Sequence, residues 1–262
     1  MRPILFPGLG LSFNINNVAF NILGKDIYWY GIIITFGLVL GIILAKKDEK
    51  KYGISWDDIT SYIIYAIIFG FICARIYYVI FKWDYYSHHL DEIIKIWHGG
   101  IAIYGGIIGA LITGIIFCKK KNINFLNLCD FGAPYLALAQ SIGRWGNFVN
   151  REAYGGATNS FLRMGIFDSQ INEYIYVHPT FLYESIANLL VFIILLCVKK
   201  NQKFDGQIFY LYMILYGIAR ACIEGLRTDS LYLGPLRISQ ILAIVFVGIF
   251  TTLYIIKMPK KK

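Results

Sequence analysis

Four short clusters of lysine each follow a long apolar run, and this pattern limits the folds open to the chain more than any other feature. The clusters are Lys46, Lys47, Lys50 and Lys51; Lys119, Lys120 and Lys121; Lys199, Lys200 and Lys203; and Lys257, Lys260, Lys261 and Lys262. Basic residues at the end of an apolar segment are typical of the cytoplasmic ends of membrane helices. Because 57% of the 262 residues are hydrophobic and only 16% are charged, a soluble domain would have too little interior for its apolar side chains. The pattern predicts an integral membrane protein surrounded by the lipid bilayer.

Seven apolar stretches are long enough to cross a bilayer as helices. The predicted spans are 27–45, 59–81, 100–118, 128–148, 180–198, 206–224 and 238–256. With the N-terminus outside and the C-terminus in the cytoplasm, seven spans place all four lysine clusters on the cytoplasmic side. We therefore expect an all-α integral membrane protein in which residues 1–262 form a single polytopic membrane domain. The hydrophilic residues 149–177 should form a small extracytoplasmic cap, and the polar residues 1–26 should lie at the membrane surface.

The formal net charge of +9 does not indicate a nucleic-acid partner. Such a partner would favour basic residues interleaved with exposed aromatic residues on one surface, whereas the basic residues here end helices. The five cysteines form no CxxC pair and no spacing typical of metal ligands, so we expect no metal site and no cofactor. In the third span, Gly105 and Gly109 have the spacing that lets two membrane helices approach closely.

The polar stretch 143–155 directly follows an apolar run, where a purely structural membrane helix has no need of charged groups. If the helix continues to Arg151, then Gln140, Arg144, Asn147 and Arg151 lie on one face. Guanidinium and amide donors on one face suit the phosphate of an anionic headgroup. The simpler interpretation is a helix-end cluster whose side chains reach towards the interface.

A second polar stripe follows the sixth span at a constant spacing of four residues. It consists of Tyr212, Tyr216, Arg220 and Glu224. An arginine in the middle of a membrane helix costs about 2.5–3.5 kcal/mol on insertion scales, so the stripe should face the protein interior. The simpler interpretation of Arg220 and Glu224 is a structural ion pair in which each neutralises the other, whereas Arg227 has no acidic partner in the stripe. Since Arg144 and Arg220 both lie near the outer ends of their spans, together they would clamp a lipid phosphate.

These motifs together resemble the bacterial prolipoprotein diacylglyceryl transferases. The segment most similar to that family is Gly143-Arg144-x-Gly146-Asn147-Phe148-x-Asn150-x-Glu152-x-x-Gly155. Further similar motifs are Trp29-Tyr30-Gly31; Trp97-x-Gly99-Gly100 followed by Gly105-Gly106; His178-Pro179-Thr180-x-Leu182-Tyr183-Glu184; and Tyr216-x-x-x-Arg220-x-x-x-Glu224-x-x-Arg227. The similarity follows the chain from the first span to the last in the order of the family.

The resemblance implies a multi-pass enzyme of the bacterial cytoplasmic (inner) membrane, with its active site towards the extracytoplasmic side. Such an enzyme transfers the diacylglyceryl group of phosphatidylglycerol to the lipobox cysteine of a prolipoprotein signal peptide, forming a thioether and releasing glycerol phosphate. Arg144 is similar to the arginine of the family that contacts phosphatidylglycerol, and Arg220 to its second essential arginine. The other expected lipid-binding residues are Asn147, Gly155, Tyr30, Tyr216 and Glu224.

The substrate cysteine supplies the nucleophile, so the enzyme has to bind the lipid and accept the thiol proton. Arg144 and Arg220 would bind the phosphate and stabilise charge on the leaving group. Tyr104, His98 and Glu152 are the candidate proton acceptors, in that order. Tyr104 stands where many members of the family have a histidine, and His98 is explained equally well as an interfacial residue.

Two functions of other classes remain as alternatives. A secondary transporter would use the membrane arginines to bind an anionic solute, but it would favour inverted repeats and paired broken helices, which the sequence does not show. A structural membrane anchor would leave the two arginine-bearing stripes unexplained.

Overall fold

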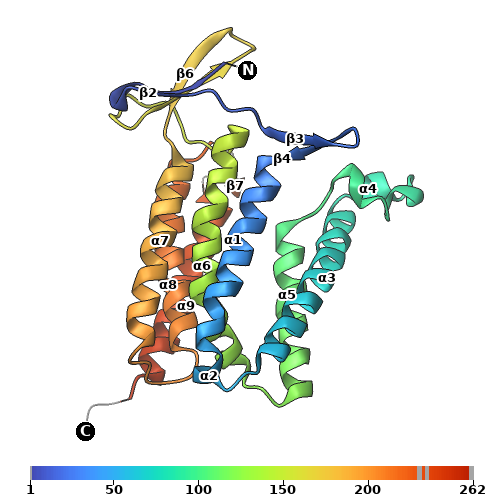
Figure 1. The fold of residues 1–262 in the computed structure, drawn as a ribbon, viewed down its shortest axis with the longest axis vertical. Helices are drawn as coiled ribbons and strands as arrows, with labels where there is room; N and C mark the ends of the chain where they lie inside the picture. The colour runs from blue at the N-terminus through green and yellow to red at the C-terminus, as the bar shows by residue number, and fades with distance from the viewer. Residues whose placement is uncertain (1, 229–231, 234–235, 260–262) are drawn as a thin grey trace. The chain divides into compact units, whose positions relative to one another are not determined.

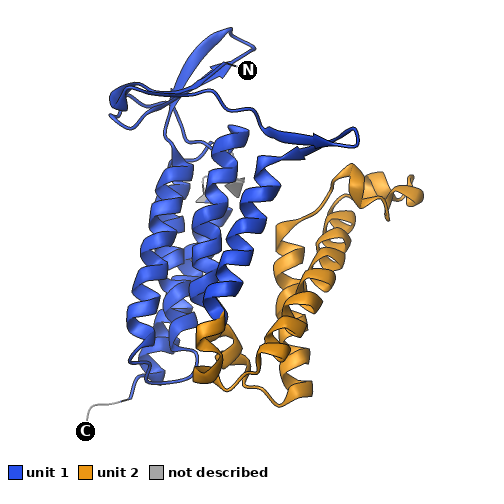
Figure 2. Cartoon of the chain, viewed as in Figure 1, with its two compact units in different colours: residues 1–45, 132–262 blue, residues 46–131 orange. Residues whose placement is uncertain are grey.

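The computed structural model describes residues 2–228, 232–233 and 236–259 (Figure 1). Part of the predicted outer loop 225–237 and the three C-terminal lysines lie outside the described residues. The chain divides into two compact units, which Figure 2 distinguishes by colour. Unit 1 consists of Met1–Ala45 and Gly132–Lys262, and unit 2 of Lys46–Phe131. Each unit is described by itself, and the single domain expected for residues 1–262 stays a prediction.

All seven predicted spans are helical. They are α1 (Trp29–Ala45), α3 (Trp56–Phe81), α5 (Ile103–Lys121), α6 (Phe125–Asn150), α7 (Thr180–Lys199), α8 (Gln207–Glu224) and α9 (Ile238–Lys257). Among the described residues, five helices are long and apolar enough to cross a membrane: Trp29–Tyr52, which contains α1, and α3, α5, α7 and α9. The chain is thus a helical, multi-pass membrane protein. α6 and α8 are not in this group of five, and they carry the two polar stripes.

The remaining helical segments are short. They are η1 (Pro7–Leu9), η2 (Lys46–Asp48), α2 (Glu49–Tyr52), α4 (Trp83–Tyr86), η3 (Leu90–Glu92) and η4 (Ile96–His98).

The expectation of an all-α chain is wrong for several short segments, which form strands. Strands β2 (Leu11–Phe13), β1 (Ile4–Phe6), β5 (Met164–Asp168) and β6 (Glu173–Val177) make one antiparallel sheet in that order. β3 (Val18–Ile22) pairs with β4 (Lys25–Tyr28), and β7 (Tyr232–Leu233) with β8 (Leu236–Arg237). The predicted cap therefore contains a hairpin, and the N-terminal lead adds two strands to it. Runs of two to five residues are too short for periodicity to separate a strand from a polar loop.

An aromatic core joins the four-stranded sheet to the ends of two helices. Phe148 of α6 and Phe181 of α7 stack with ring centroids 4.7 Å apart, and Phe6 of β1 packs against Phe148 at 6.1 Å. The buried apolar residues that complete this core are Ile4, Val149, Met164, Ile166 and Val177. The core holds the C-terminal end of α6 beside the N-terminal end of α7, and Figure 1 shows the sheet at this end of the two helices.

Two serines fix α6 to α7, one helical turn from Phe181 on α7 and two turns from Phe148 on α6. Ser141 Oγ donates a hydrogen bond to Ser185 O at 2.8 Å, and Ser185 Oγ donates one to Ser141 O at 2.9 Å. Trp145 Nε1 also donates to Ser185 Oγ at 3.1 Å. Because both hydroxyls are buried and bonded to backbone, the pairing fixes the relative height of the two helices. The residues next to Ser141 and Ser185 along each helix therefore face each other at a set level.

In unit 2, the spacing of two glycines sets the contact between α3 and α5. A Cβ atom added at Gly105 would lie 2.5 Å from Cys73 O, and one added at Gly109 would lie 2.8 Å from Phe69 O. Both distances are shorter than van der Waals contact allows, so only glycine permits this approach. The prediction of close helix packing at these two glycines is confirmed.

Arg75 of α3 is buried and organises the loop that leads into α5. Its guanidinium donates hydrogen bonds to four backbone carbonyls, those of Glu92, Ile93, Gly99 and Gly100, at 2.6–2.8 Å. Gly99 and Gly100 have φ of +87° and +77°, a region that residues with a Cβ atom rarely adopt. A Cβ atom at Gly100 would also lie 2.5 Å from Arg75 Nη1. The glycine pair therefore allows the backbone to wrap around this arginine.

Candidate active site

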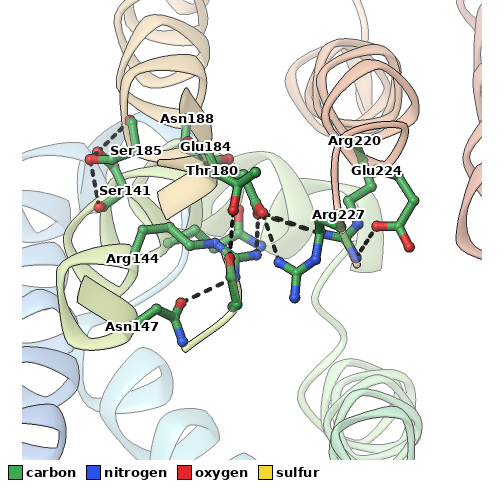
Figure 3. Close-up of polar contacts among 12 residues, drawn as sticks. Ser141, Arg144, Asn147, Thr180, Glu184, Ser185, Asn188, Arg220, Glu224 and Arg227 are labelled. Atoms are coloured by element: carbon green, nitrogen blue, oxygen red, sulfur yellow. Dashed lines mark hydrogen bonds and ion pairs between the residues drawn. The ribbon is translucent and has the colours of Figure 1, made fainter. Parts of the chain in front are cut away.

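Three arginines from separate segments of unit 1 converge on one carboxylate, that of Glu184 (Figure 3). Glu184 is the fifth residue of α7 and only 4% of its surface is exposed. Arg144 Nη2 of α6 lies 2.5 Å from Glu184 Oε2. Arg227 Nη1, just beyond α8, lies 3.0 Å from Glu184 Oε1, and Arg220 Nη1 of α8 lies 3.4 Å from the same oxygen. Glu184 is therefore the centre of a buried ionic cluster.

A second carboxylate completes the cluster. Arg220 Nη2 lies 2.5 Å from Glu224 Oε2, one helical turn further along α8. We call these five residues the Glu184 cluster: Arg144, Glu184, Arg220, Glu224 and Arg227. Three guanidiniums and two carboxylates leave one positive charge in excess. A charge in a buried site is costly unless it is paired, so this excess favours a further anion.

The exposure of the side chains shows from which side an anion would approach. The side chains of Arg144 and Arg220 are 24% and 21% exposed, whereas those of Glu184 and Glu224 are 4% and 2% exposed. Arg227 is also nearly buried, at 10%. The accessible part of the cluster is thus formed by the two arginines that the sequence assigns to phosphate binding, with their counter-ions behind them.

The helix that carries Arg144 ends one residue before Arg151, which the predicted polar face included. α6 ends at Asn150, and Arg151 has a left-handed φ of +56°. The prediction that Arg151 shares a face with Gln140, Arg144 and Asn147 is therefore wrong, because its side chain leaves the helix and donates to Ile15 O at 3.3 Å. The reversal of the backbone directs the following loop back towards α7 and α8.

Gly155 lies where this loop meets the start of α7 and the end of α8. Its N–H donates to His178 O at 2.9 Å, and the N–H of Gly156 donates to Leu226 O at 2.8 Å. A Cβ atom at Gly155 would lie 2.7 Å from Leu226 O and 2.8 Å from His178 Cβ. Gly155 also forms a β-bridge with Arg227. The structure thus gives Gly155 a packing role that holds Arg227 against Glu184, and its predicted contact with lipid remains a prediction.

A chain of hydrogen bonds leads from the cluster to the surface. Arg144 Nη1 donates to Asn147 Oδ1 at 3.3 Å, and Asn147 Nδ2 donates to Glu152 Oε1 at 2.9 Å. Asn150 Nδ2 reaches the same oxygen of Glu152 at 3.4 Å. Glu152 itself is exposed. Glu152, the candidate proton acceptor in unit 1, is therefore linked to Arg144 through one amide.

The tyrosines expected at the site lie on two different helices. The ring of Tyr30 covers Gly146, where an added Cβ atom would lie 2.8 Å from Tyr30 Cδ2. Tyr212 and Tyr216 stack with ring centroids 5.6 Å apart, and Tyr212 Oη donates to Gln140 Oε1 at 3.0 Å. Together with buried Glu224, these contacts confirm that the stripe on α8 faces the interior of unit 1.

His98 and Tyr104 lie in unit 2. His98 Nδ1 lies 2.8 Å from Glu92 Oε2, and Tyr104 is half exposed in the first turn of α5. The hydrogen bond from Lys95, and then that from His98, holds the pKa of the Glu92 carboxyl below its usual range. His98 is thus engaged by a carboxylate, beside the ring of Trp97 at 6.1 Å. The assignment of either residue as proton acceptor stays a prediction.

Sequence reasoning did not assign roles to two members of the cluster, Glu184 and Arg227. Arg227 lacked a partner because its partner lies on another helix, 43 positions earlier. Glu184 is the one acidic residue in the sequence of α7. A carboxylate in an otherwise apolar membrane helix indicates a basic partner or a functional site, and this signal could have identified it.

A family model described as "Prolipoprotein diacylglyceryl transferase" matches residues 17–256. The chain belongs to the prolipoprotein diacylglyceryl transferase family. The matched residues contain the whole Glu184 cluster. Membership of a transferase family decides against the secondary transporter and the structural anchor.

Three similar relatives, each named phosphatidylglycerol–prolipoprotein diacylglyceryl transferase, match most of the chain. The protein of Finegoldia magna is 52% identical over 233 residues, which cover 88% of this chain and 92% of the relative. The protein of Clostridioides difficile is 49% identical over 247 residues, covering 94% and 97%. The protein of Staphylococcus aureus strain Newman is 47% identical over 260 residues, covering 96% and 93%. The similarity to prolipoprotein diacylglyceryl transferases thus extends over nearly the full length of each relative.

Proposed function

We propose that the Glu184 cluster binds the phosphate of phosphatidylglycerol during transfer of its diacylglyceryl group to a prolipoprotein. As a member of its family, the chain is a transferase that acts in the first step of lipoprotein maturation. The observation that carries the proposal is the partial exposure of Arg144 and Arg220 in a cluster with one excess positive charge. A phosphodiester carries one negative charge, so the headgroup neutralises the site. Two planar guanidiniums also match the oxygens of a phosphate.

The role of the two arginines in the transfer reaction follows from where negative charge develops. The sulfur of the lipobox cysteine attacks the glycerol carbon that bears the phosphodiester, a C–S bond forms, and the C–O bond breaks. The oxygen of the departing glycerol phosphate keeps the electron pair, and the thiol proton passes to a protein group. Arg144 and Arg220 stabilise the second negative charge that develops on the phosphate.

The proton acceptor is one of three residues, Glu152, Tyr104 or His98. The amide of Asn147 links Glu152 to Arg144 in unit 1. Glu152→Gln, Tyr104→Phe and His98→Gln, made singly, identify the acceptor as the residue whose loss removes the pH dependence of transfer between about pH 6 and pH 9. A variant with wild-type rates excludes the residue that it replaces.

The pairing of distant segments supports seven membrane spans. β1 pairs with β5, so Leu5 and Gly165 lie on one side of the membrane and the chain between them crosses an even number of times. α1, α3 and α5 provide three crossings, and α6 would provide the fourth. The hydrogen bond from Gly156 N to Leu226 O likewise favours two crossings, by α7 and α8. The lysine clusters then favour a position of the Glu184 cluster on the extracytoplasmic side of the cytoplasmic membrane.

Labelling of introduced cysteines tests this topology. In a functional variant whose native cysteines are serines, Gln170→Cys in the turn between β5 and β6 is expected to react with a membrane-impermeant maleimide on intact cells. Gln202→Cys, between α7 and α8, is expected to react only after the membrane is permeabilised. Equal labelling of both positions on intact cells would contradict seven spans with an outer N-terminus.

A transfer assay with the purified protein tests the phosphate site. Arg144→Ala is expected to lower transfer of labelled diacylglyceryl from phosphatidylglycerol to a lipobox peptide by about 10²-fold, because one donor to the developing charge is lost. Arg163→Ala is the matched control, since Arg163 contacts only backbone oxygens and the Tyr176 ring among its described contacts. Full transfer by Arg144→Ala, or an equal loss in both variants, would overturn the assignment.

A further inference from the structure

Glu184 uses both carboxylate oxygens to hold three guanidiniums, and this arrangement exceeds what a structural ion pair requires. Oε2 faces Arg144, while Oε1 faces Arg220 and Arg227. One arginine would neutralise one buried glutamate, and burial of additional guanidiniums is unfavourable without further anions. Glu224 supplies only one. Glu184 therefore holds three arginines together at the site, and its own negative charge lowers the net positive charge of the cluster to one.

We propose that Glu184 is a specificity-determining residue that sets the charge of the phosphate site, so that the site accepts a phosphate with one negative charge and releases one with two. This inference rests on the proposed function of the cluster. The lipid phosphate is a diester with one negative charge, which matches the single excess positive charge of the five side chains. Phosphate and cluster together are neutral when the lipid is bound.

The reaction changes the net charge of the phosphate and the Glu184 cluster together. When the C–O bond breaks, the leaving glycerol phosphate becomes a monoester, which carries close to two negative charges above its second pKa of about 6. The site then holds one negative charge in excess, and the charge of Glu184, which is part of this sum, opposes retention of the product. Without the charge of Glu184, the site would carry two positive charges and would match the product instead of the lipid.

The charge on Glu184 can be removed with little change of shape. Glu184→Gln is expected to lower the inhibition constant of glycerol phosphate, measured in competition with phosphatidylglycerol, by about tenfold, which corresponds to about 1.4 kcal/mol. Turnover should slow while the KM for the lipid changes less, because release of product becomes limiting. Glu184→Asp keeps the charge and should keep the inhibition constant within about threefold of the wild type. Glu173→Gln, which removes an exposed carboxylate on β6, is the matched control and should match the wild type.

A second measurement uses the unmodified protein and does not depend on a variant that folds. Inhibition by glycerol phosphate should weaken as pH rises from 5 to 8, because the inhibitor gains its second charge near pH 6. Glycerophosphoglycerol, a diester that does not titrate in this range, should inhibit equally at both ends. In Glu184→Gln the trend for glycerol phosphate should reverse.

The outcomes separate this inference from the proposed function. If glycerol phosphate inhibits the wild type equally at pH 5 and pH 8, or if Glu184→Gln loses activity with no change in the inhibition constant, Glu184 is a structural ion-pair partner only. If the wild type transfers the lipid group but is inhibited by neither phosphate compound, the cluster is not the phosphate site, and the proposed function fails together with this inference.

Discussion

Replacement of Arg220 by alanine is expected to reduce diacylglyceryl transfer by about 10³-fold, the upper end of the loss seen when one donor to a developing oxyanion is removed. Arg220 pairs with both carboxylates of the cluster, those of Glu184 and Glu224. Its side chain is also partly exposed, so it lies between the two buried carboxylates and on the face that we propose receives the headgroup. Measurement of transfer by the purified variant at saturating lipid gives this loss directly.

Loss of stability has to be separated from loss of catalysis in this variant. Arg220→Ala leaves Glu224 buried without this partner, and an uncompensated buried charge costs about 3–5 kcal/mol. In the double variant Arg220→Ala/Glu224→Ala the pair is removed together, so most of the stability should return. Transfer should remain low, because no guanidinium replaces Arg220. Recovery of transfer along with stability would show that Arg220 serves the fold and not the reaction.

A single methyl group at Gly155 is expected to destabilise unit 1 by about 1–3 kcal/mol. The added Cβ atom would lie 2.7 Å from the backbone oxygen of Leu226, and a backbone oxygen held in a hydrogen bond cannot turn away as a side chain can. The end of α8 must shift instead, and Arg227 shifts with it. Because a displacement of about 1 Å at a catalytic site can lower a rate about 10²-fold, transfer should fall by that order.

The neighbouring glycine provides the control. A Cβ atom at Gly156 would have Leu226 O as its nearest neighbour at 4.0 Å, which is ordinary van der Waals contact. Gly156→Ala should therefore retain the thermal stability and transfer of the wild type, both measured in the same detergent. Equal behaviour of the two alanine variants would show that Leu226 and Arg227 tolerate movement, and that the close approach at Gly155 is not needed for the cluster.

The sequence predicted the helices well because their signal is local. Apolar length and the lysine clusters located all seven helices, with bounds that differ from the structure by at most three residues at each end. Spacing of four residues also placed Tyr212, Tyr216, Arg220 and Glu224 on one inward face. In each case the determining residues lie within a few turns of one another, where helical geometry alone fixes the result.

The parts that sequence reasoning missed depend on contacts between distant segments. Spacing along α8 pairs Arg220 with Glu224, but it contains no information about Glu184, which lies 36 positions away on α7. The sheet was missed for the same reason, because β1 has only three residues and one of its two partners is the distant segment around Gly165. The end of α6 depends on a left-handed Arg151, whose side chain is held by a carbonyl 136 positions earlier. Such contacts can be identified only from the three-dimensional structure.

The pairing of Leu5 with Gly165 also determines the order in which the protein can be completed. Synthesis proceeds from the N-terminus, so β1 is made long before β5, and four long helices are made in the interval. During this time β1 can pair with β2, but its other edge lacks the partner that β5 provides. A sheet that depends on contacts so distant in sequence forms slowly. The edge of β1 that pairs with β5 can therefore be completed only after the four helices between the two strands have been made.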